Sequence, residues 1–295
     1  MSAAAERFPI RTIRANDLEF GYLEAGDGPL ALCLHGFPDS AYTWRHLLPA
    51  LADAGYHAVA PFLRGYAPTE VPADGAYQTG ALVADAVALH EALGGDEHAV
   101  IIGHDWGAAA AYGALTHAPD RWRRAVTMAV PPMSVLMTGF FDYAQLKRSF
   151  YVFVFQTSLA EIAVAADDMT FLDGLWRDWS PGYDAAEDLA HVKDCLREPA
   201  NLTAAIGYYR AMLDATRNLD AYAGEQRATG EPPERPVLYL HGRDDGCIGV
   251  ELTADVGAHL GAGSHLERID AAGHFLHLER PAEVNRHVLD WLARA

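Results

Sequence analysis

Short apolar runs recur along most of the chain, and helical patterns separate them. Runs without strict alternation are typical of strands that are buried on both faces of a parallel sheet. We expect such strands at 30–34, 57–61, 99–102, 125–130 and 237–240, with a weaker one at 266–269. Two earlier patches within 8–24 do alternate, and Asn16-Asp17 between them is a hairpin turn signal. These patches predict two antiparallel strands at one edge of the sheet.

Helical patterns fill most of the intervals between the predicted strands. We expect helices at 42–54, around 82–93, after Gly107, at about 250–260 and from Pro281 onward. Strands that alternate with helices imply a mostly parallel central sheet with helices on both faces, which is an α/β fold.

One long block interrupts this rhythm. From Met133 to Arg227 the pattern is helical and rich in aromatic residues, and no strand is expected. We interpret 133–227 as a helical cap (lid) inserted into a core formed by 1–132 and 228–295. We expect the cap to lie over the carboxyl edge of the sheet, where ligands bind in open α/β sheets.

The sequence Gly103-His104-Asp105-Trp106-Gly107 directly follows the predicted strand at 99–102. A strand, a turn flanked by two glycines and a helix of small residues form the layout of a nucleophile elbow. The glycines allow a sharp turn and a close approach of helix to strand. The usual central residue is serine, but here it is Asp105. The alternative is that Asp105 only caps the helix that follows.

A nucleophile on such an elbow needs a base and an orienting acid, in the chain order nucleophile, acid, histidine. His274 is the candidate base because it lies in a loop between the last strand and the last helix, directly after a glycine. His277 is the weaker candidate. Asp245 is the candidate acid, since Gly-x-x-Asp is the usual spacing at this turn, and Asp244 is the alternative.

His35-Gly36-Phe37-Pro38 follows an earlier strand, at the position of an oxyanion loop. The backbone N–H groups of Phe37 and Trp106 are the candidate donors to a developing negative oxygen. We expect His35 and His104 to be structural and to hold these loops by hydrogen bonds.

The composition of the chain limits which partners and which cellular compartment we expect. The net charge of −18 makes nucleic acid and anionic membrane surfaces poor partners, and no apolar run approaches the length of a membrane span. Three unevenly spaced cysteines form neither a disulfide framework nor a zinc site, and Met1 to Ile10 has no signal pattern. We therefore expect a reduced, cytoplasmic setting. No cofactor or metal motif is visible, and the oligomeric state, monomer or homodimer, stays open.

An aspartate nucleophile changes the expected reaction. A carboxylate is already ionised near neutral pH and can attack an sp³ carbon that carries a leaving group, either an epoxide oxygen or a halide. Opening an epoxide generates an alkoxide, which needs an acid such as a phenol. Tyr151 and Tyr209 in the cap are the candidates, with Tyr208 as the alternative to Tyr209.

The chain resembles the epoxide hydrolases of the α/β-hydrolase fold, the group that includes the soluble epoxide hydrolases. The resemblance spans almost the whole chain, in the segments His35-Gly-Phe-Pro38, Leu63-Arg-Gly-Tyr66, Gly103-His-Asp-Trp-Gly107, Phe155-Gln156 after Tyr151, Tyr209-Arg210, Asp245 and Gly273-His-Phe275. It implies that Asp105 forms an ester with the substrate, that Tyr151 and Tyr209 polarise the epoxide oxygen, and that His274 with Asp245 drives hydrolysis to a vicinal diol. Val154 and Thr157-Ser158 depart from the usual family residues without removing any of these groups.

Aromatic residues suggest that the substrate is a small apolar epoxide. The candidate substrate-binding residues are Phe37, Pro38, Trp106, Phe140, Phe153 and Phe275. Two alternatives to epoxide hydrolysis stay open. One is a haloalkane dehalogenase that uses the same nucleophile, with Trp106 and a cap tryptophan (Trp176 or Trp179) as halide donors. The other is a non-catalytic ligand-binding protein on this fold.

Overall fold

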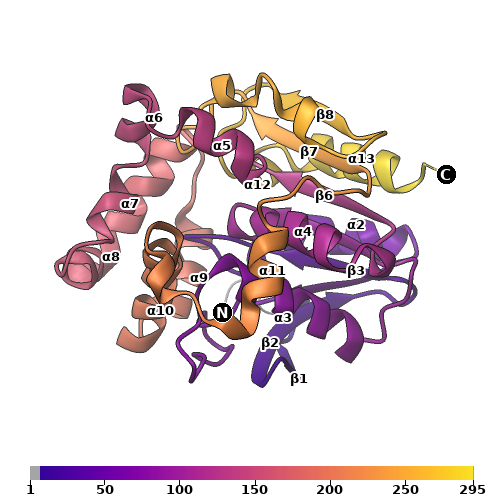
Figure 1. Ribbon diagram of the computed structural model, residues 1–295, viewed down its shortest axis with the longest axis horizontal. Helices are drawn as coiled ribbons and strands as arrows, with labels where there is room; N and C mark the ends of the chain where they lie inside the picture. The colour runs from indigo at the N-terminus through magenta and orange to yellow at the C-terminus, as the bar shows by residue number, and fades with distance from the viewer. Residues whose placement is uncertain (1–6, 295) are drawn as a thin grey trace.

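The computed structural model describes residues 7–294, and its centre is a single eight-stranded sheet (Figure 1). The strand order is β1-β2-β4-β3-β5-β6-β7-β8. The strands are β1 (Arg11–Ala15), β2 (Leu18–Ala25), β3 (Leu30–Leu34), β4 (His57–Pro61), β5 (Val100–His104), β6 (Arg124–Met128), β7 (Val237–Gly242) and β8 (His265–Ile269). All neighbours from β4 to β8 pair in parallel, whereas β2 pairs antiparallel with β1 and β4. The predicted mostly parallel sheet with an antiparallel edge is confirmed.

The edge hairpin forms for the reason that its sequence suggests. Asn16 and Asp17 both have positive φ, 44° and 59°, and Ala15 pairs with Leu18 across the turn. Asparagine and aspartate tolerate this conformation better than other non-glycine residues, and it matches the twist of a two-residue hairpin.

Helices cover both faces of the sheet. On one face lie α3 (Thr79–Ala92), α4 (Trp106–His117) and α11 (Ala223–Ala228), and the other face carries α2 (Leu47–Asp53) and α13 (Pro281–Leu292) (Figure 1). The short α12 (Leu276–Glu279) precedes α13 and packs against it. Among the described residues, no helix is long and apolar enough to cross a membrane.

Two predicted helices differ in the structure. The segment predicted at 42–54 begins as a 3₁₀ helix, Ala41–His46, and becomes α-helical only in α2. The helix predicted at about 250–260 is wrong: two 3₁₀ turns, Val250–Thr253 and Val256–His259, stand there. Asp255 and Gly257 are poor residues for a helix interior, and they lie where a continuous helix would need its middle turn.

Between β6 and β7 the described chain is helical and lies beyond the carboxyl ends of the parallel strands (Figure 1). These helices are α5 (Met133–Gly139), α6 (Tyr143–Arg148), α7 (Phe150–Val154), α8 (Ala160–Trp179), α9 (Ala186–Leu196) and α10 (Pro199–Leu213). Helix α10 is fastened to the loop after β4, where the Tyr208 hydroxyl and the Asn201 amide donate to the carbonyls of Arg64 and Gly65, each over 2.7 Å. Helix α11, at the end of the range predicted for the cap, packs against α3 and α4 instead. The division into core and cap stays a prediction.

Candidate active site

The elbow turn joins β5 to α4 and holds Asp105 in a conformation that few non-glycine residues adopt, with φ 52° and ψ −116°. A Cβ atom on Gly103 would lie 2.1 Å from the carbonyl oxygen of Gly107, and one on Gly107 would lie 2.0 Å from that of Leu34. Only glycine therefore fits at these two positions. The Asp105 side chain makes no capping hydrogen bond to α4. The structure thus disfavours the reading of Asp105 as a mere helix cap.

The two carboxylate oxygens of Asp105 have different surroundings. Oδ1 accepts a hydrogen bond of 2.7 Å from the backbone N–H of Phe37. Oδ2 lies 3.8 Å from Nε2 of His274. Burial raises the pKa of Asp105 above its usual value, although His274 and the backbone N–H groups of Phe37 and Trp106 act in the opposite direction. The candidate nucleophile therefore has one oxygen fixed by the Phe37 N–H, while the other lies toward His274.

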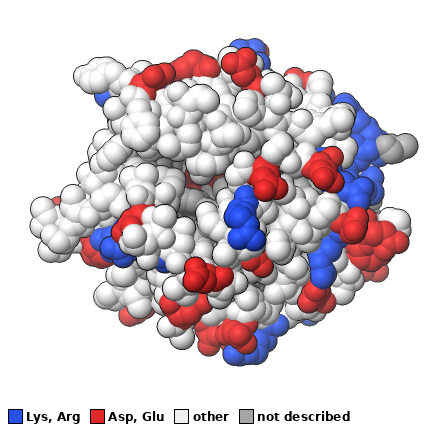
Figure 2. Space-filling model, in the orientation of Figure 1, with Lys and Arg blue, Asp and Glu red and all other residues white. Residues whose placement is uncertain are grey.

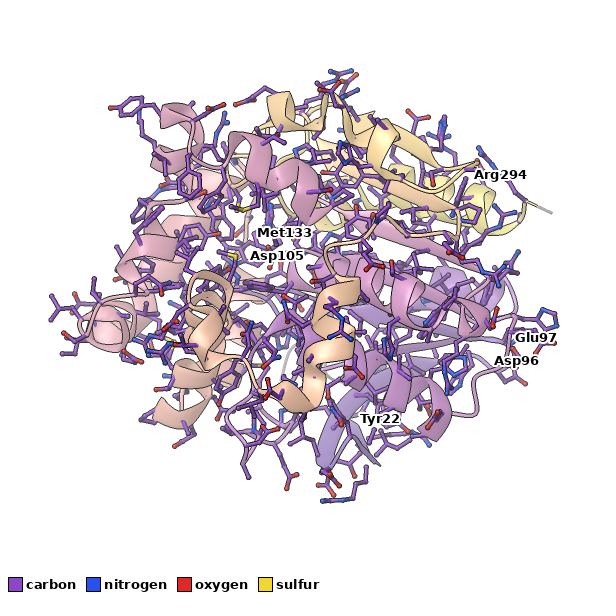
Figure 3. The ribbon with its side chains drawn as sticks, viewed as in Figure 1. Tyr22, Asp96, Glu97, Asp105, Met133 and Arg294 are labelled. Atoms are coloured by element: carbon purple, nitrogen blue, oxygen red, sulfur yellow. The ribbon has the colours of Figure 1, made fainter. Side chains whose placement is uncertain are left out.

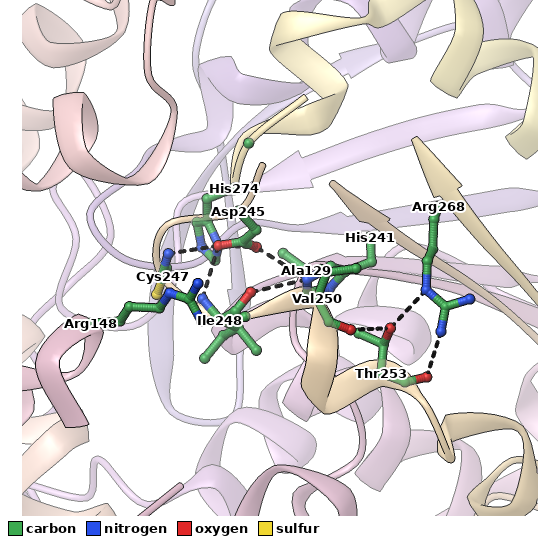
Figure 4. Close-up of polar contacts among 12 residues, drawn as sticks. Ala129, Arg148, His241, Asp245, Cys247, Ile248, Val250, Thr253, Arg268 and His274 are labelled. Atoms are coloured by element: carbon green, nitrogen blue, oxygen red, sulfur yellow. Dashed lines mark hydrogen bonds and ion pairs between the residues drawn. The ribbon is translucent and has the colours of Figure 1, made fainter. Parts of the chain in front are cut away.

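His274 and Asp245 form a buried pair (Figure 4), and His274 also lies next to Asp105. Nδ1 of His274 lies 3.0 Å from Oδ2 of Asp245. Oδ1 of Asp245 accepts from the backbone N–H groups of Cys247 and Ile248 over 2.7 and 2.9 Å. Asp244 is exposed, so the structure brings Asp245 and not Asp244 to His274.

The electrostatics of this pair bear on its use as a base. Burial alone would lower the pKa of His274, but the charge of Asp245 and the hydrogen bond to it outweigh burial and raise that pKa above its usual value. Nε2 of His274 is buried and has no hydrogen-bond partner among the described residues. This nitrogen is therefore the one that is left to receive a proton from a bound water.

The two other predicted histidines hold loops together. Nε2 of His35 accepts from the backbone N–H of Leu63 over 3.0 Å, and burial lowers the pKa of His35 to about 4. Nε2 of His104 lies 2.9 Å from the carbonyl oxygen of His274. His277 contacts Thr43 instead of Asp105. These contacts agree with structural roles for His35 and His104.

Tyr151 on α7 and Tyr209 on α10 line one cavity together with Asp105. Their ring centroids lie 5.4 Å apart. The Tyr209 hydroxyl is buried without a hydrogen-bond partner among the described residues, and that of Tyr151 lies 3.6 Å from Sγ of Cys247. Burial raises the pKa of both phenols well above 10, so both keep their protons. Tyr208 is turned away, toward the carbonyl of Arg64.

Polar side chains beside the two tyrosines tie their helices to each other. The amide of Gln156, two residues after α7, donates to the carbonyl of Tyr209 over 3.0 Å. Arg210 donates in return to the carbonyl of Phe155 over 2.9 Å and pairs with Glu161 over 2.6 Å. These contacts give a physical reason for the Phe155-Gln156 and Tyr209-Arg210 segments.

The cavity wall differs from the predicted set of substrate-binding residues. Trp106 and Phe140 line the cavity, but Phe37, Pro38, Phe153 and Phe275 do not. Phe153 is two residues from Tyr151 on the same helix, so it faces the other side and is 39% exposed. Phe275 stacks on Trp176, with ring centroids 3.5 Å apart.

The remaining two predicted residues lie just behind this wall. Phe37 packs edge-on against Tyr209, with its ring centroid 5.2 Å away, and Pro38 accepts the indole N–H of Trp176 at its carbonyl over 2.8 Å. Both belong to the predicted oxyanion loop, and the backbone N–H of Phe37 in this loop donates to Asp105.

Most of the cavity lining was missed by sequence reasoning. The further residues are Ala109, Val130, Met133, Leu136, Ser149, Val152, Met212 and Ile248. Figure 3 shows Asp105 and Met133 near the centre of the molecule, and in the same view Figure 2 shows a central hollow with uncharged surface above it and to its left. The sequence positions of two of these residues could have indicated that they lie near the site. Met133 is the first residue of the predicted cap, and Ile248 follows Asp245 by three residues.

Trp179 at the end of α8, which the sequence offered only as a possible halide donor, packs against the candidate catalytic residues. Its ring lies 5.0 Å from the rings of both His274 and Tyr151, and its carbonyl accepts the backbone N–H of His274 over 3.0 Å. It joins the core side of the site to the helices above it.

Comparisons with known proteins agree with this arrangement. The α/β hydrolase fold family matches residues 29–281. The chain is 32% identical to epoxide hydrolase A of Mycobacterium tuberculosis over 321 aligned positions, which cover 96% of each chain. It is 30% identical to epoxide hydrolase 3 of Siraitia grosvenorii over 315 positions, which cover 95% of this chain and 97% of that one.

Solved structures extend the likeness to three dimensions. The epoxide hydrolase of Bacillus megaterium, crystallised with an inhibitor, superposes with a TM-score of 0.82 at 26% identity, covering 96% of this chain and 100% of that one. Epoxide hydrolase A of Mycobacterium thermoresistibile gives a TM-score of 0.76 at 29% identity, covering 97% and 98%. The chain belongs to the α/β-hydrolase fold family and, within it, to the epoxide hydrolases.

Proposed function

We propose that the protein hydrolyses small apolar epoxides to vicinal diols through an ester between the substrate and Asp105. The observation that carries this proposal is the single cavity lined by Asp105, Tyr151 and Tyr209, next to the buried His274–Asp245 pair. The similarity to named epoxide hydrolases supports the reaction class.

The first step opens the ring. Oδ2 of Asp105 attacks one ring carbon, the bond from that carbon to the epoxide oxygen breaks, and the resulting alkoxide takes a proton from Tyr151 or Tyr209. Oδ1 stays on the Phe37 N–H and becomes the carbonyl oxygen of the ester. The assignment of the two oxygens rests on this contact, because a backbone donor stabilises the oxygen that stays on the protein.

The second step releases the diol. His274 takes a proton from a water, which attacks Cγ of Asp105, and Oδ1 carries the negative charge of the tetrahedral intermediate. The Phe37 N–H, 2.7 Å from Oδ1, stabilises that charge. Collapse of the intermediate breaks the bond from Cγ to Oδ2, and Oδ2 leaves in the diol with the proton that His274 holds. The second proton of the water returns to the tyrosine that opened the ring, so the water oxygen stays on Asp105 as part of its carboxylate.

Dehalogenation by the same nucleophile is the second candidate function. The indole N–H of Trp106 is buried, has no partner among the described residues, and belongs to a residue that lines the cavity. The second donor that a halide needs has less support, because the indole N–H of Trp176 is taken by the carbonyl of Pro38. Halide release from a panel of chloroalkanes and bromoalkanes, with no diol from any epoxide, would establish this alternative.

The decisive experiment traps the ester. We expect His274→Gln, incubated with styrene oxide, to gain the mass of one substrate molecule on the intact protein, while the wild type releases diol. The double variant Asp105→Asn/His274→Gln is the control and should gain no mass. An unmodified His274→Gln protein that still produces diol would contradict the covalent route.

Isotope labelling tests the same route in the wild type. Under single-turnover conditions in ¹⁸O-labelled water, the label should enter the peptide that contains Asp105, and the first diol released should carry none. Label in that first diol with none on Asp105 would show direct attack by water.

A further inference from the structure

Three buried polar side chains converge behind His274, outside the cavity that Asp105 lines. They are Asp39 after β3, His104 at the end of β5 and His277 on α12. Oδ2 of Asp39 and the Nδ1 atoms of both histidines are buried without a hydrogen-bond partner among the described residues. One candidate ligand atom from each residue lies within 4.8 Å of the others. Buried polar groups nearly always have partners, so three unsatisfied atoms on residues that lie this close together need an explanation.

The contacts of His104 leave its Nδ1 lone pair free. Nε2 of His104 lies 2.9 Å from the carbonyl oxygen of His274, and a carbonyl only accepts, so Nε2 carries the hydrogen. In the neutral ring Nδ1 is then an acceptor, and it lies 4.0 Å from Oδ2 of Asp39, too far for a hydrogen bond.

His277 and Asp39 are fixed in a similar way. Nε2 of His277 contacts the hydroxyl oxygen of Thr43, and that hydroxyl also acts on the Asp39 carboxylate as a hydrogen-bond donor. A hydroxyl has a single proton, so Thr43 accepts from His277, whose Nδ1 keeps its lone pair. Oδ1 of Asp39 accepts the Ser40 N–H over 2.7 Å, which leaves Oδ2 free.

We propose that Asp39, His104 and His277 form a binding site for a divalent first-row transition metal ion, with zinc as the preferred occupant. Two imidazole nitrogens and one carboxylate oxygen are ligands that zinc accepts, with water as the fourth. Hydrogen bonds that fix the opposite nitrogen of each ring are the usual support of metal-binding histidines. Tetrahedral zinc ligands lie about 3.3 Å apart, so the three ligand atoms must approach one another by up to about 1.5 Å when the ion binds.

The ion would act on the neighbouring active site, an inference that rests on the proposed function. The rings of His104 and His274 lie 4.8 Å apart, and His104 holds the backbone carbonyl of His274. Drawing His104 toward the metal shifts His274 from the position at which it activates water. We expect bound zinc to slow hydrolysis of the ester by about tenfold or more, because small misplacements of a catalytic group are costly.

Metal binding is tested without reference to turnover. The purified protein is incubated with Zn²⁺ or Co²⁺, dialysed, and analysed for bound metal by mass spectrometry, and the Co²⁺ form is examined for the visible absorption of a tetrahedral site. We expect about one ion per chain in the wild type. The variants His277→Gln and Asp39→Asn should lose this ion, and the exposed His98→Gln should keep it.

The outcomes separate the metal site from surface binding and from the catalytic proposal. Wild type without metal, or His277→Gln binding as much as wild type, would overturn the site. Circular dichroism identifies a variant that fails to fold. X-ray absorption at the zinc edge of the wild type then decides independently, since it should show two imidazoles and oxygen ligands, and any other ligand set contradicts the site. Metal bound at the expected ratio in a protein that makes no diol would refute the catalytic proposal alone.

Discussion

Two sides of the candidate site hold their groups by different means: the core side on the central sheet, and the cap side on the helices between β6 and β7. On the core side, Oδ1 of Asp105 and Oδ1 of Asp245 each accept backbone N–H groups at 2.7 Å. On the cap side, the Tyr209 hydroxyl makes no hydrogen bond within residues 7–294, and the Tyr151 hydroxyl lies 3.6 Å from the thiol of Cys247. The two phenols are held by ring packing instead, and the Tyr209 ring lies 5.1 to 5.2 Å from the rings of Trp106, Phe37 and Phe155.

This difference corresponds to the two steps of the proposed mechanism. Hydrolysis of the ester needs a base and an oxyanion donor at fixed positions, and backbone hydrogen bonds supply that rigidity. Ring opening needs protons that no protein group already uses, and packing can position a phenol while its O–H stays available. A buried hydroxyl without a partner is unfavourable, and an epoxide oxygen would satisfy it.

The largest effect is expected from breaking the core pair. In Asp245→Asn the side chain loses the charge that raises the pKa of His274 and orients its ring. We expect diol formation to fall by about 10⁴-fold, a loss of the size known for the equivalent change in serine protease triads. Alkylation of Asp105 should continue, so the ester should accumulate and be visible by intact mass.

The neighbouring substitution Asp244→Asn is the matched control. It removes the same charge from the same turn, but Asp244 is exposed. It should leave the rate within a factor of about two, as for most surface substitutions. Equal losses in the two variants would show that the turn, and not the pair with His274, matters.

A smaller loss is expected from displacing Asp105 without altering its chemistry. A Cβ on Gly36 would lie 2.2 Å from Oδ1 of Asp105, so Gly36→Ala must push this carboxylate off the Phe37 N–H. We expect kcat/KM to fall by about 10²-fold, the usual cost of a 1 Å misplacement. Gly257→Ala is the control, because a Cβ there meets no atom within 4 Å. An unchanged kcat/KM in Gly36→Ala would mean that the oxygen does not need this donor.

On the cap side, adjacent tyrosines give a matched pair. Tyr209→Phe removes a hydroxyl from the cavity, and we expect ring opening to slow by up to about 10²-fold, because Tyr151 can still donate. Tyr208→Phe removes a hydroxyl that bonds the Arg64 carbonyl, so it should cost about 1 kcal/mol of stability and leave the rate unchanged. Stopped-flow alkylation and thermal unfolding measure the two effects, and the reverse pattern would exchange the roles of Tyr208 and Tyr209.

The same contrast decides how much the sequence could predict. The glycines at 36, 103 and 107 are visible in the sequence, because a Cβ atom at any of these positions would collide with a neighbouring atom. The elbow and the oxyanion loop could therefore be predicted from them. Packing between aromatic rings has no comparable sequence pattern. In the sequence, Phe153 and Tyr151 are both aromatic residues of the predicted cap. Only the orientation of α7 in the structure places Tyr151 at the cavity and leaves Phe153 39% exposed. The three atoms behind His274 come from segments more than 60 residues apart and share no local motif.

The pH dependence of the two reaction steps should differ in the wild-type protein. His274 acts as a base only when it is neutral, and its pKa is raised above 6.5. Hydrolysis of the ester should therefore fall about tenfold per pH unit below that raised pKa and level off above it. Asp105 attacks as the ionised carboxylate, and burial raises its pKa from 3.8.

Alkylation should persist wherever Asp105 is still ionised, including pH values at which His274 is already protonated. At a pH where Asp105 is ionised and His274 is protonated, rapid quenching followed by intact mass should then reveal accumulated ester, and at higher pH it should reveal little. In Asp245→Asn the pKa of His274 loses its main raising influence, so the acid limb of ester hydrolysis should move to lower pH than in the wild type. An acid limb shared by both steps would assign the titrating group to Asp105 and remove His274 from the hydrolytic step.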